Sequence, residues 1–161
     1  MANVKENIEL EDNRLDKKVK VKSIAPWVTG SPRKTSSGDI SIPASGSILL
    51  TREEVIAQAQ NGNKLISGVD GLGSHATWYI EDEFTRKELS FEIDGKSQAF
   101  LTHEDINRYF SLKTQKSFED NITKNIVTRA EKAFLIESIK ALGLNDYQKI
   151  AFCIEYTGIK P

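Results

Sequence analysis

The chain has 161 residues, with 22 basic and 23 acidic side chains and a formal net charge of −1. This length suits one compact domain, or a small domain with an appendage. The balanced charge argues against a protein whose whole surface holds nucleic acid or anionic lipid, because such surfaces are usually clearly basic. Cys153 is the single cysteine, so an intramolecular disulfide and a thiolate metal cluster are both excluded.

The N-terminal segment lacks the apolar stretch of a secretory signal. No run anywhere in the chain approaches the roughly 20 apolar residues of a membrane helix. We therefore expect a protein that is made and used in the cytosol, with no membrane partner. Residues 1–16 mix both signs of charge with isolated apolar positions, and we interpret them as an N-terminal arm that is either frayed or ordered on a neighbouring subunit.

Valine alternates with lysine over residues 17–24, which predicts a β-strand with its lysines on a solvated face. Lysines also discourage unwanted pairing when they lie along an edge strand. Together with basic residues elsewhere in the chain, these lysines would form a phosphate-binding patch. Because Asp12 and Asp16 lie beside them, we do not expect a nucleic-acid partner. The basic residues concerned are Arg14, Lys18, Lys20, Lys22, Arg33 and Lys34.

The next segment combines an aromatic residue with a polar loop. Pro26 ends the strand, and Gly30–Gly38 has a glycine at each end, a proline and several hydroxyl side chains, so we predict a loop. We interpret Trp27 as a core or rim residue. The loop is polar and suited to contact a partner, so Arg33 and Lys34 are candidate partner-binding residues. Trp27, just before the loop, is a third candidate.

Residues 38–73 have the clearest local pattern in the chain. The alternation of Ile40 and Ile42 with polar residues and the apolar run at 48–50 predict two strands separated by a turn. Thr51 and Glu54 then match the T-x-x-E capping box, which predicts a helix near residues 52–60.

A glycine-rich segment, Gly68–Gly73, follows that helix. Its glycine spacing does not match that of a phosphate-binding loop, so we predict a tight turn with positive φ angles. His75 comes directly afterwards. We interpret it as structural or simply exposed, because no nucleophile or metal ligand accompanies it in the sequence.

The β portion is predicted to continue to residue 101. Alternating apolar residues indicate a strand over Ala76–Ile80, and Glu81–Lys87 is predicted to be a charged turn. A second alternation over Leu89–Ile93 leads to Asp94–Gly95, the strongest hairpin-turn signal in the chain, before Gln98–Leu101 returns as its partner strand.

From residue 102 the pattern becomes helical. Thr102 and Asp105 resemble a capping box with the shorter Asp in place of Glu, and Thr128 and Glu131 form a complete one. Another short helix is predicted between them, over Ser117–Lys124. These signals indicate that the last third of the chain contains no strand.

The longest apolar-rich stretch lies between Thr128 and Gly143. Its apolar residues cover more than half of the circumference of a helix, so they must be covered on several sides by the same domain or by another protein. Phe134 and Leu135 are therefore further candidate partner-binding residues. Asn145 is predicted to cap the last helix, which would complete an antiparallel helical hairpin.

Together these elements predict an α+β fold, with a small and mostly antiparallel β domain that carries one inserted helix, followed by a C-terminal helical hairpin. The predicted boundaries are residues 1–16 for the arm, 17–101 for the β-rich domain and 102–161 for the helical region.

The sequence contains no recognisable catalytic constellation. The two histidines and the cysteine belong to three different predicted elements and have no supporting signature. The consecutive acidic residues 81–83 do not follow the spacing of a calcium-binding loop. We therefore expect a protein that is not an enzyme and has no catalytic residue, metal site or cofactor.

The succession S-I-A-P-W-V-T-G, then G-D-I-S-I-P-A-S-G-S-I-L-L-T-R-E-E-V and G-N-K-L-I-S-G, resembles small accessory proteins of tailed bacteriophages that sit on or near the capsid. The resemblance covers Ser23–Gly73 and, more loosely, the helical tail. It implies a non-enzymatic protein of the virion, assembled in the host cytoplasm, present in many copies, and bound to capsid or connector subunits or to itself through its arm, loops and tail. The alternative is a soluble inhibitor or regulator of a single host or phage protein.

Overall fold

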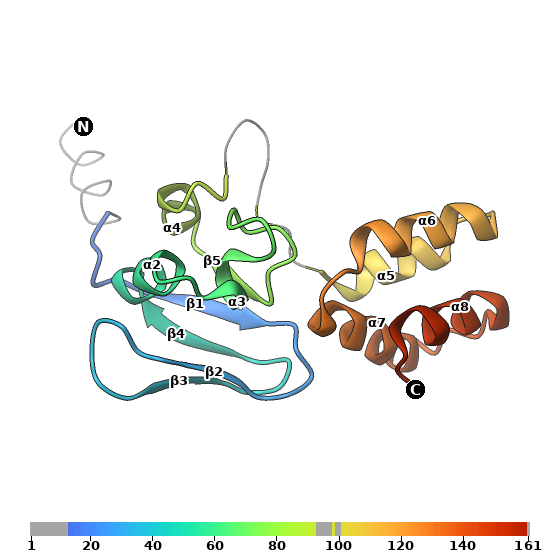
Figure 1. Cartoon of the computed structure of the whole chain (residues 1–161), viewed down its shortest axis with the longest axis horizontal. Coiled ribbons are helices and arrows are strands. Elements are labelled where there is room, and N and C mark those ends of the chain that lie inside the picture. Colours follow the sequence, from blue (N-terminus) through green and yellow to red (C-terminus); the bar gives the residue numbers. More distant parts are fainter. Residues whose placement is uncertain (1–12, 93–97, 99–100, 161) are drawn as a thin grey trace, which may run out of the picture.

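The computed structural model describes residues 13–92, 98 and 101–160. It confirms the predicted α+β fold. Figure 1 shows two parts side by side, with the strands and the first helices in blue to green and the later helices in yellow to red. We call residues 13–92 and 98 the β half, and residues 101–160 the helical half. The predicted arm lies outside the described residues up to position 12.

A three-stranded antiparallel sheet forms the centre of the β half. β1 (Lys18–Ser23) lies between β4 (Ser47–Thr51) and β5 (Trp78–Glu81). The valines of β1 face the core, and its lysines lie on the opposite face. The predicted strand is confirmed. Edge protection does not account for its lysines, because β1 is hydrogen-bonded to a neighbour on both sides.

A separate hairpin consists of β2 (Thr29–Pro32) and β3 (Asp39–Ile42). The loop predicted over residues 30–38 is therefore shorter than expected, because its first three residues pair with β3. Pro32 is tolerated because β2 is an edge strand, with β3 as its one partner in the two-stranded sheet. Arg33 N donates to Gly38 O at 2.9 Å and closes the loop that joins the two strands.

The predicted helix is confirmed as α2 (Arg52–Gln60), which begins after Thr51. Its capping box is only half formed. Thr51 Oγ1 accepts the N–H of Glu54 at 3.1 Å, but the Glu54 carboxylate turns away to accept the N–H groups of Lys34 and Thr35 instead. A tertiary contact has therefore displaced the local contact that the sequence predicts.

A second helix, α3 (Lys64–Ser67), follows α2 and was not predicted. Its N-cap, Asn63, accepts the N–H of Leu65 at 3.0 Å. The glycine-rich turn after it is confirmed, with positive φ at Gly68, Gly71 and Gly73. The inner face of the sheet packs against both helices and the hairpin in one buried apolar cluster of Val19, Val21, Ile40, Ile42, Leu50, Val55, Ile66, Trp78, Ile80 and Phe91.

The charged turn predicted after β5 is wrong, because these residues form α4 (Glu83–Glu88). Asp82 caps this helix by accepting the N–H of Thr85 at 3.2 Å. The strand predicted from Leu89 is also wrong for residues 89–92, since Leu89 caps the end of α4. The predicted Asp94–Gly95 turn lies outside the described residues.

The free side of β5 is occupied by a side chain. Gln98 accepts the N–H of Ile80 at 3.2 Å and donates to Trp78 O at 3.3 Å. The amide of Gln98 therefore makes the type of hydrogen bonds that a neighbouring strand would make.

The helical half consists of α5 (His103–Phe110), α6 (Gln115–Asn125), α7 (Arg129–Ala141) and α8 (Tyr147–Thr157) among the described residues. Neighbours pack as α5 with α6, α5 with α7, α6 with α8, and α7 with α8. The predicted hairpin of α7 and α8 is thus one side of a four-helix arrangement (Figure 1).

Helix boundaries in this half follow the local signals closely. Both predicted capping boxes, at Thr102 with Asp105 and at Thr128 with Glu131, are formed. The last helix is capped by Asp146 and not by Asn145, because Asp146 Oδ1 accepts the N–H of Lys149 at 3.2 Å.

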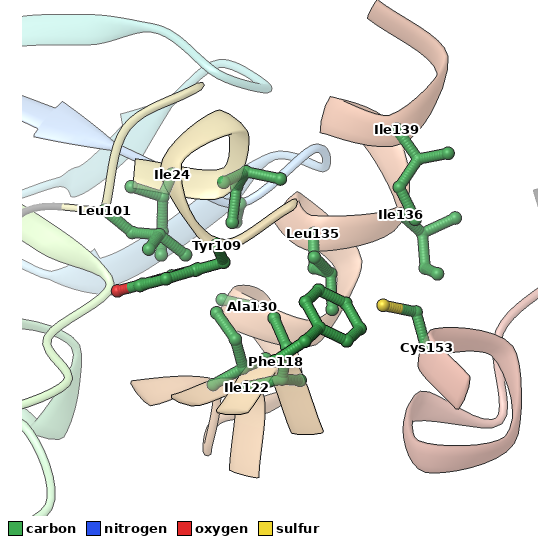
Figure 2. Close-up of a cluster of buried hydrophobic side chains, with 13 residues drawn as sticks. Ile24, Leu101, Tyr109, Phe118, Ile122, Ala130, Leu135, Ile136, Ile139 and Cys153 are labelled. Atoms are coloured by element: carbon green, nitrogen blue, oxygen red, sulfur yellow. The ribbon is translucent and has the colours of Figure 1, made fainter. Parts of the chain in front are cut away.

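Figure 2 shows the core of the helical half, where Phe118 and Leu135 lie opposite Cys153 of α8. Burial raises the pKa of the Cys153 thiol to about 12. Ile24, which follows β1, also belongs to this core. The chain that leaves the sheet therefore fixes one half against the other.

Candidate protein-binding surface

Five large apolar side chains are exposed on three segments that meet near the first turn of α7. The segments are the link between β1 and β2, the glycine-rich loop after α3, and the residues just before α7. We call these side chains the junction surface: Trp27 (37% exposed), Val28 (65%), Val69 (60%), Leu72 (44%) and Val127 (42%). Exposed apolar side chains on neighbouring segments are candidates for a protein contact site.

The link that carries Trp27 is fixed to the helical half. Ile24 and Ala25 are buried in the helical core just before it. The guanidinium of Arg129, in the first turn of α7, lies 5.4 Å from the centre of the Trp27 ring, within the range of a cation–π contact. Trp27 is thus a rim residue that is held in place and partly open to solvent.

The glycine-rich loop is joined to α7 through His75. Both oxygens of the Glu131 carboxylate lie 3.0 Å from Nδ1 of His75. One of these oxygens also accepts the N–H groups of Val127 and Thr128 at 3.0 Å. His75 adopts a positive φ of 56°. Its ring is used to connect two segments, as expected of a structural histidine.

The loop itself is folded around Asp70. The Asp70 carboxylate accepts the N–H groups of Leu72 at 2.8 Å and Ser74 at 3.1 Å, and the Ser74 hydroxyl at 2.6 Å. Gly68 is required here, since a Cβ at this position would lie 2.0 Å from Ser74 O. These contacts fix the loop backbone from which Val69 and Leu72 are exposed.

The two basic candidates, Arg33 and Lys34, lie at the far end of β2 from Trp27, so the structure does not bring all three together. Their loop is anchored to α2. Glu54 accepts the N–H of Lys34 at 3.0 Å and the hydroxyl of Thr35 at 3.2 Å.

Burial raises the pKa of Glu54, but the hydrogen bonds that this carboxylate accepts outweigh burial and hold its pKa below the ordinary value. The donors are the backbone of Lys34, the side chain of Gln58, and the backbone and hydroxyl of Thr35. Glu54 therefore anchors the loop as a carboxylate, and Arg33 and Lys34 project from a fixed backbone.

The two candidates on α7 differ from each other. Leu135 is fully buried in the helical core, so it cannot contact a partner while the domain is folded. Its assignment as a partner-binding residue is corrected for that reason. Phe134 is half-buried, stacks on His103 with ring centres 5.0 Å apart, and lines an open cavity of about 400 Å³ between the two halves.

The same cavity is lined by a histidine that lies close to a serine. His103 Nδ1 lies 2.9 Å from the Ser138 hydroxyl, which itself donates to Phe134 O at 2.7 Å. The direction of the His103 contact depends on the tautomer of the imidazole, because the Ser138 hydroxyl has a single proton to donate. Ser138 is itself fully buried, so its hydroxyl is not open to the cavity.

Within the described ranges, no group of three or more His, Cys, Asp or Glu side chains is placed to hold a metal ion. No helix of that part of the chain is long and apolar enough to cross a membrane. Comparison of the chain with protein-family models, with curated proteins and with solved structures finds no match in any of the three.

Sequence reasoning identified Trp27 but missed the other four members of the junction surface. Val69 and Leu72 carry a weak signal, because apolar residues between glycines in a turn are often exposed. Val28 and Val127 carry none, since only the folded chain shows that these two valines are exposed near the same turn of α7.

Proposed function

We propose that the protein is a non-enzymatic structural component of a bacteriophage particle, which binds capsid or connector subunits through the junction surface. The observation that carries this proposal is that five large apolar side chains are exposed on segments that are already fixed to α7. Association orders little additional chain when the contacting segments are held beforehand, so less entropy is lost on binding.

Two further features support the proposal. The Ser23–Gly73 segment resembles capsid-associated accessory proteins, and it supplies every member of the junction surface except Val127. Arg33 and Lys34 offer a second, basic contact on an anchored loop. Many copies on a repeated lattice would strengthen weak contacts of this kind by avidity.

Gradient sedimentation of a native lysate from the source, with the protein quantified in each fraction by mass spectrometry, tests the proposal. A virion component is expected in the fast particle fraction at a fixed ratio to the major capsid protein. Recovery only near the size of a free protein or small complex would overturn the virion assignment and favour an inhibitor or regulator.

Variants test the surface itself. The double change Val28→Asp and Val69→Asp places two charges on exposed positions, so folding is preserved while incorporation into particles is expected to fall by about tenfold or more. Tyr147→Asp is the matched control, because Tyr147 is 90% exposed at the start of α8 and lies outside the junction surface. Equal incorporation of the double variant and the wild type would exclude the junction surface as the contact.

A further inference from the structure

The outer face of the three-stranded sheet carries an ordered column of lysines. The strand register places side chains in cross-strand rows on this face, because residues directly opposite each other point to the same side. Lysine is the middle member of two rows of three and belongs to a third row of two. The rows are Ser47, Lys22 and Tyr79; Leu49, Lys20 and Glu81; and Thr51 with Lys18.

This lysine column, Lys18, Lys20 and Lys22, is open to solvent. The side chains of Lys20 and Lys22 are 50% and 38% exposed, and Leu49 beside them is 60% exposed. Protection of a sheet edge does not explain these lysines, since β1 is the central strand. The role of these lysines must therefore be sought on the outer face of the sheet, where they lie.

The spacing of the column suits a chain of phosphates. Alternate residues of a strand lie about 6.6–6.8 Å apart, from a rise of about 3.3–3.4 Å per residue. A stretched single strand of nucleic acid places successive phosphates at a comparable separation, about twice the 3.4 Å rise per nucleotide of a duplex strand. The exposed Leu49 and the half-buried Tyr79, whose ring centre lies 5.4 Å from the Arg86 guanidinium, flank the column where unstacked bases would lie.

One acidic residue lies among these lysines. Glu81 Oε1 is 2.6 Å from the ammonium of Lys22, and Glu81 Oε2 is 3.9 Å from that of Lys20. The carboxylate holds two of the three lysines in position in the free protein. A phosphate that binds there replaces Glu81 as their partner, so Glu81 opposes binding.

From this arrangement we propose that the lysine column binds the phosphate backbone of single-stranded nucleic acid, independently of base sequence. Contacts with three phosphates predict a slope of about −2 when the logarithm of the association constant is plotted against that of the salt concentration. The lysine column shares no residue with the junction surface.

The test is fluorescence anisotropy of a labelled oligothymidylate of about 20 nucleotides, mixed with the full chain at several salt concentrations. The wild type is expected to bind at micromolar concentration in low salt, with a Kd of about 10⁻⁶ to 10⁻⁴ M. The variant with Lys18→Glu, Lys20→Glu and Lys22→Glu is expected to bind about 100-fold more weakly. Lys18 and Lys20 are exposed and Lys22 is partly exposed, and circular dichroism checks that the variant remains folded.

The matched control changes three exposed lysines elsewhere, Lys64→Glu, Lys113→Glu and Lys116→Glu, and is expected to stay within about threefold of the wild type. Glu81→Gln is expected to increase affinity by about threefold, a gain that a merely structural lysine face would not show. Equal losses of affinity in both triple variants would show that net charge alone explains the effect, and would overturn the proposal. Equally tight binding of poly-L-glutamate would identify an acidic polypeptide as the ligand, which also overturns it.

Discussion

Each half of the molecule is stabilised internally by a different kind of interaction. In the β half, buried polar side chains connect segments that are far apart in sequence. Arg52 donates to both oxygens of Asp82 at 2.8 and 3.1 Å, Glu54 anchors the loop of the hairpin, and Gln98 covers the side of β5. Each of these links depends on a specific pair of groups.

In the helical half, segments that are far apart in sequence are connected by the packing of aromatic and aliphatic side chains. Phe118 lies at the centre, with its ring 4.8 Å from that of Phe110 and 6.1 Å from that of Phe152. Lys149 is the main exception, since its buried ammonium donates to Phe110 O at 2.6 Å and to Leu112 O at 2.7 Å at the end of α5.

The contrast follows from the length of regular structure in each half. The helices of the helical half satisfy most of their backbone groups internally, so their contacts can be apolar. The β half has short strands and irregular links, and its backbone groups need side-chain partners. In the described part of the chain, every buried side-chain polar atom has a hydrogen-bond partner.

The largest expected effect tests the apolar core. Phe118→Ala removes a fully buried ring and should lower the free energy of unfolding by about 4 kcal/mol, through lost transfer energy and the cavity that remains. Urea unfolding followed by circular dichroism measures it. Alkylation of Cys153, which is buried beside this ring, should become faster in the variant. Tyr147→Ala, at an exposed position, is the control, and an equal loss there would contradict the assignment.

The next effect tests the buried polar links. Arg52→Ala leaves the largely buried Asp82 carboxylate without its cationic partner and should cost about 3 kcal/mol. Lys87→Ala, which breaks the exposed pair with Glu83, should leave stability unchanged. The double variant Arg52→Met with Asp82→Asn should recover much of the loss, because Asn still caps α4 and no charge stays buried. Failure to recover would show that Arg52 acts through packing.

The smallest expected effect is on acid stability. Burial raises the pKa of Asp82, but hydrogen bonds and charge from Arg52 and hydrogen bonds from Thr85 outweigh it, and the pKa is lowered, as it is for Glu54. A lowered pKa in the folded state stabilises the protein above the ordinary values of 3.8 and 4.5, and this stability is lost as the pH falls through the folded-state values.

Hydrogen exchange measured between neutral pH and pH 3 resolves this effect by segment. The hairpin loop and the α2 to α4 region should lose protection before the helical core does. Glu54→Gln should make the loop less sensitive to acid, because it removes the titrating group. Earlier loss of protection in α6 and α8 would show that the helical half, and not the β half, is the more sensitive to acid.

Local signals determined much of the fold. The capping boxes at Thr102 and Thr128 and the glycine turn after α3 depend on residues within a few positions of each other, and the structure has them as predicted. The box at Thr51 was only half right, since the Glu54 carboxylate binds Lys34 and Thr35, about 20 positions away.

The sequence alone determined that Val19 and Val21 face inward and the lysines of β1 face outward, because alternation along a strand is a property of the backbone. It also determined the helical character of the last third of the chain. Only the tertiary structure decided that β1 is the central strand, that Leu135 is enclosed, and that Trp27, Val69 and Val127 lie around one turn of α7. These outcomes depend on which distant segments pair and pack, and neither periodicity nor capping contains that information.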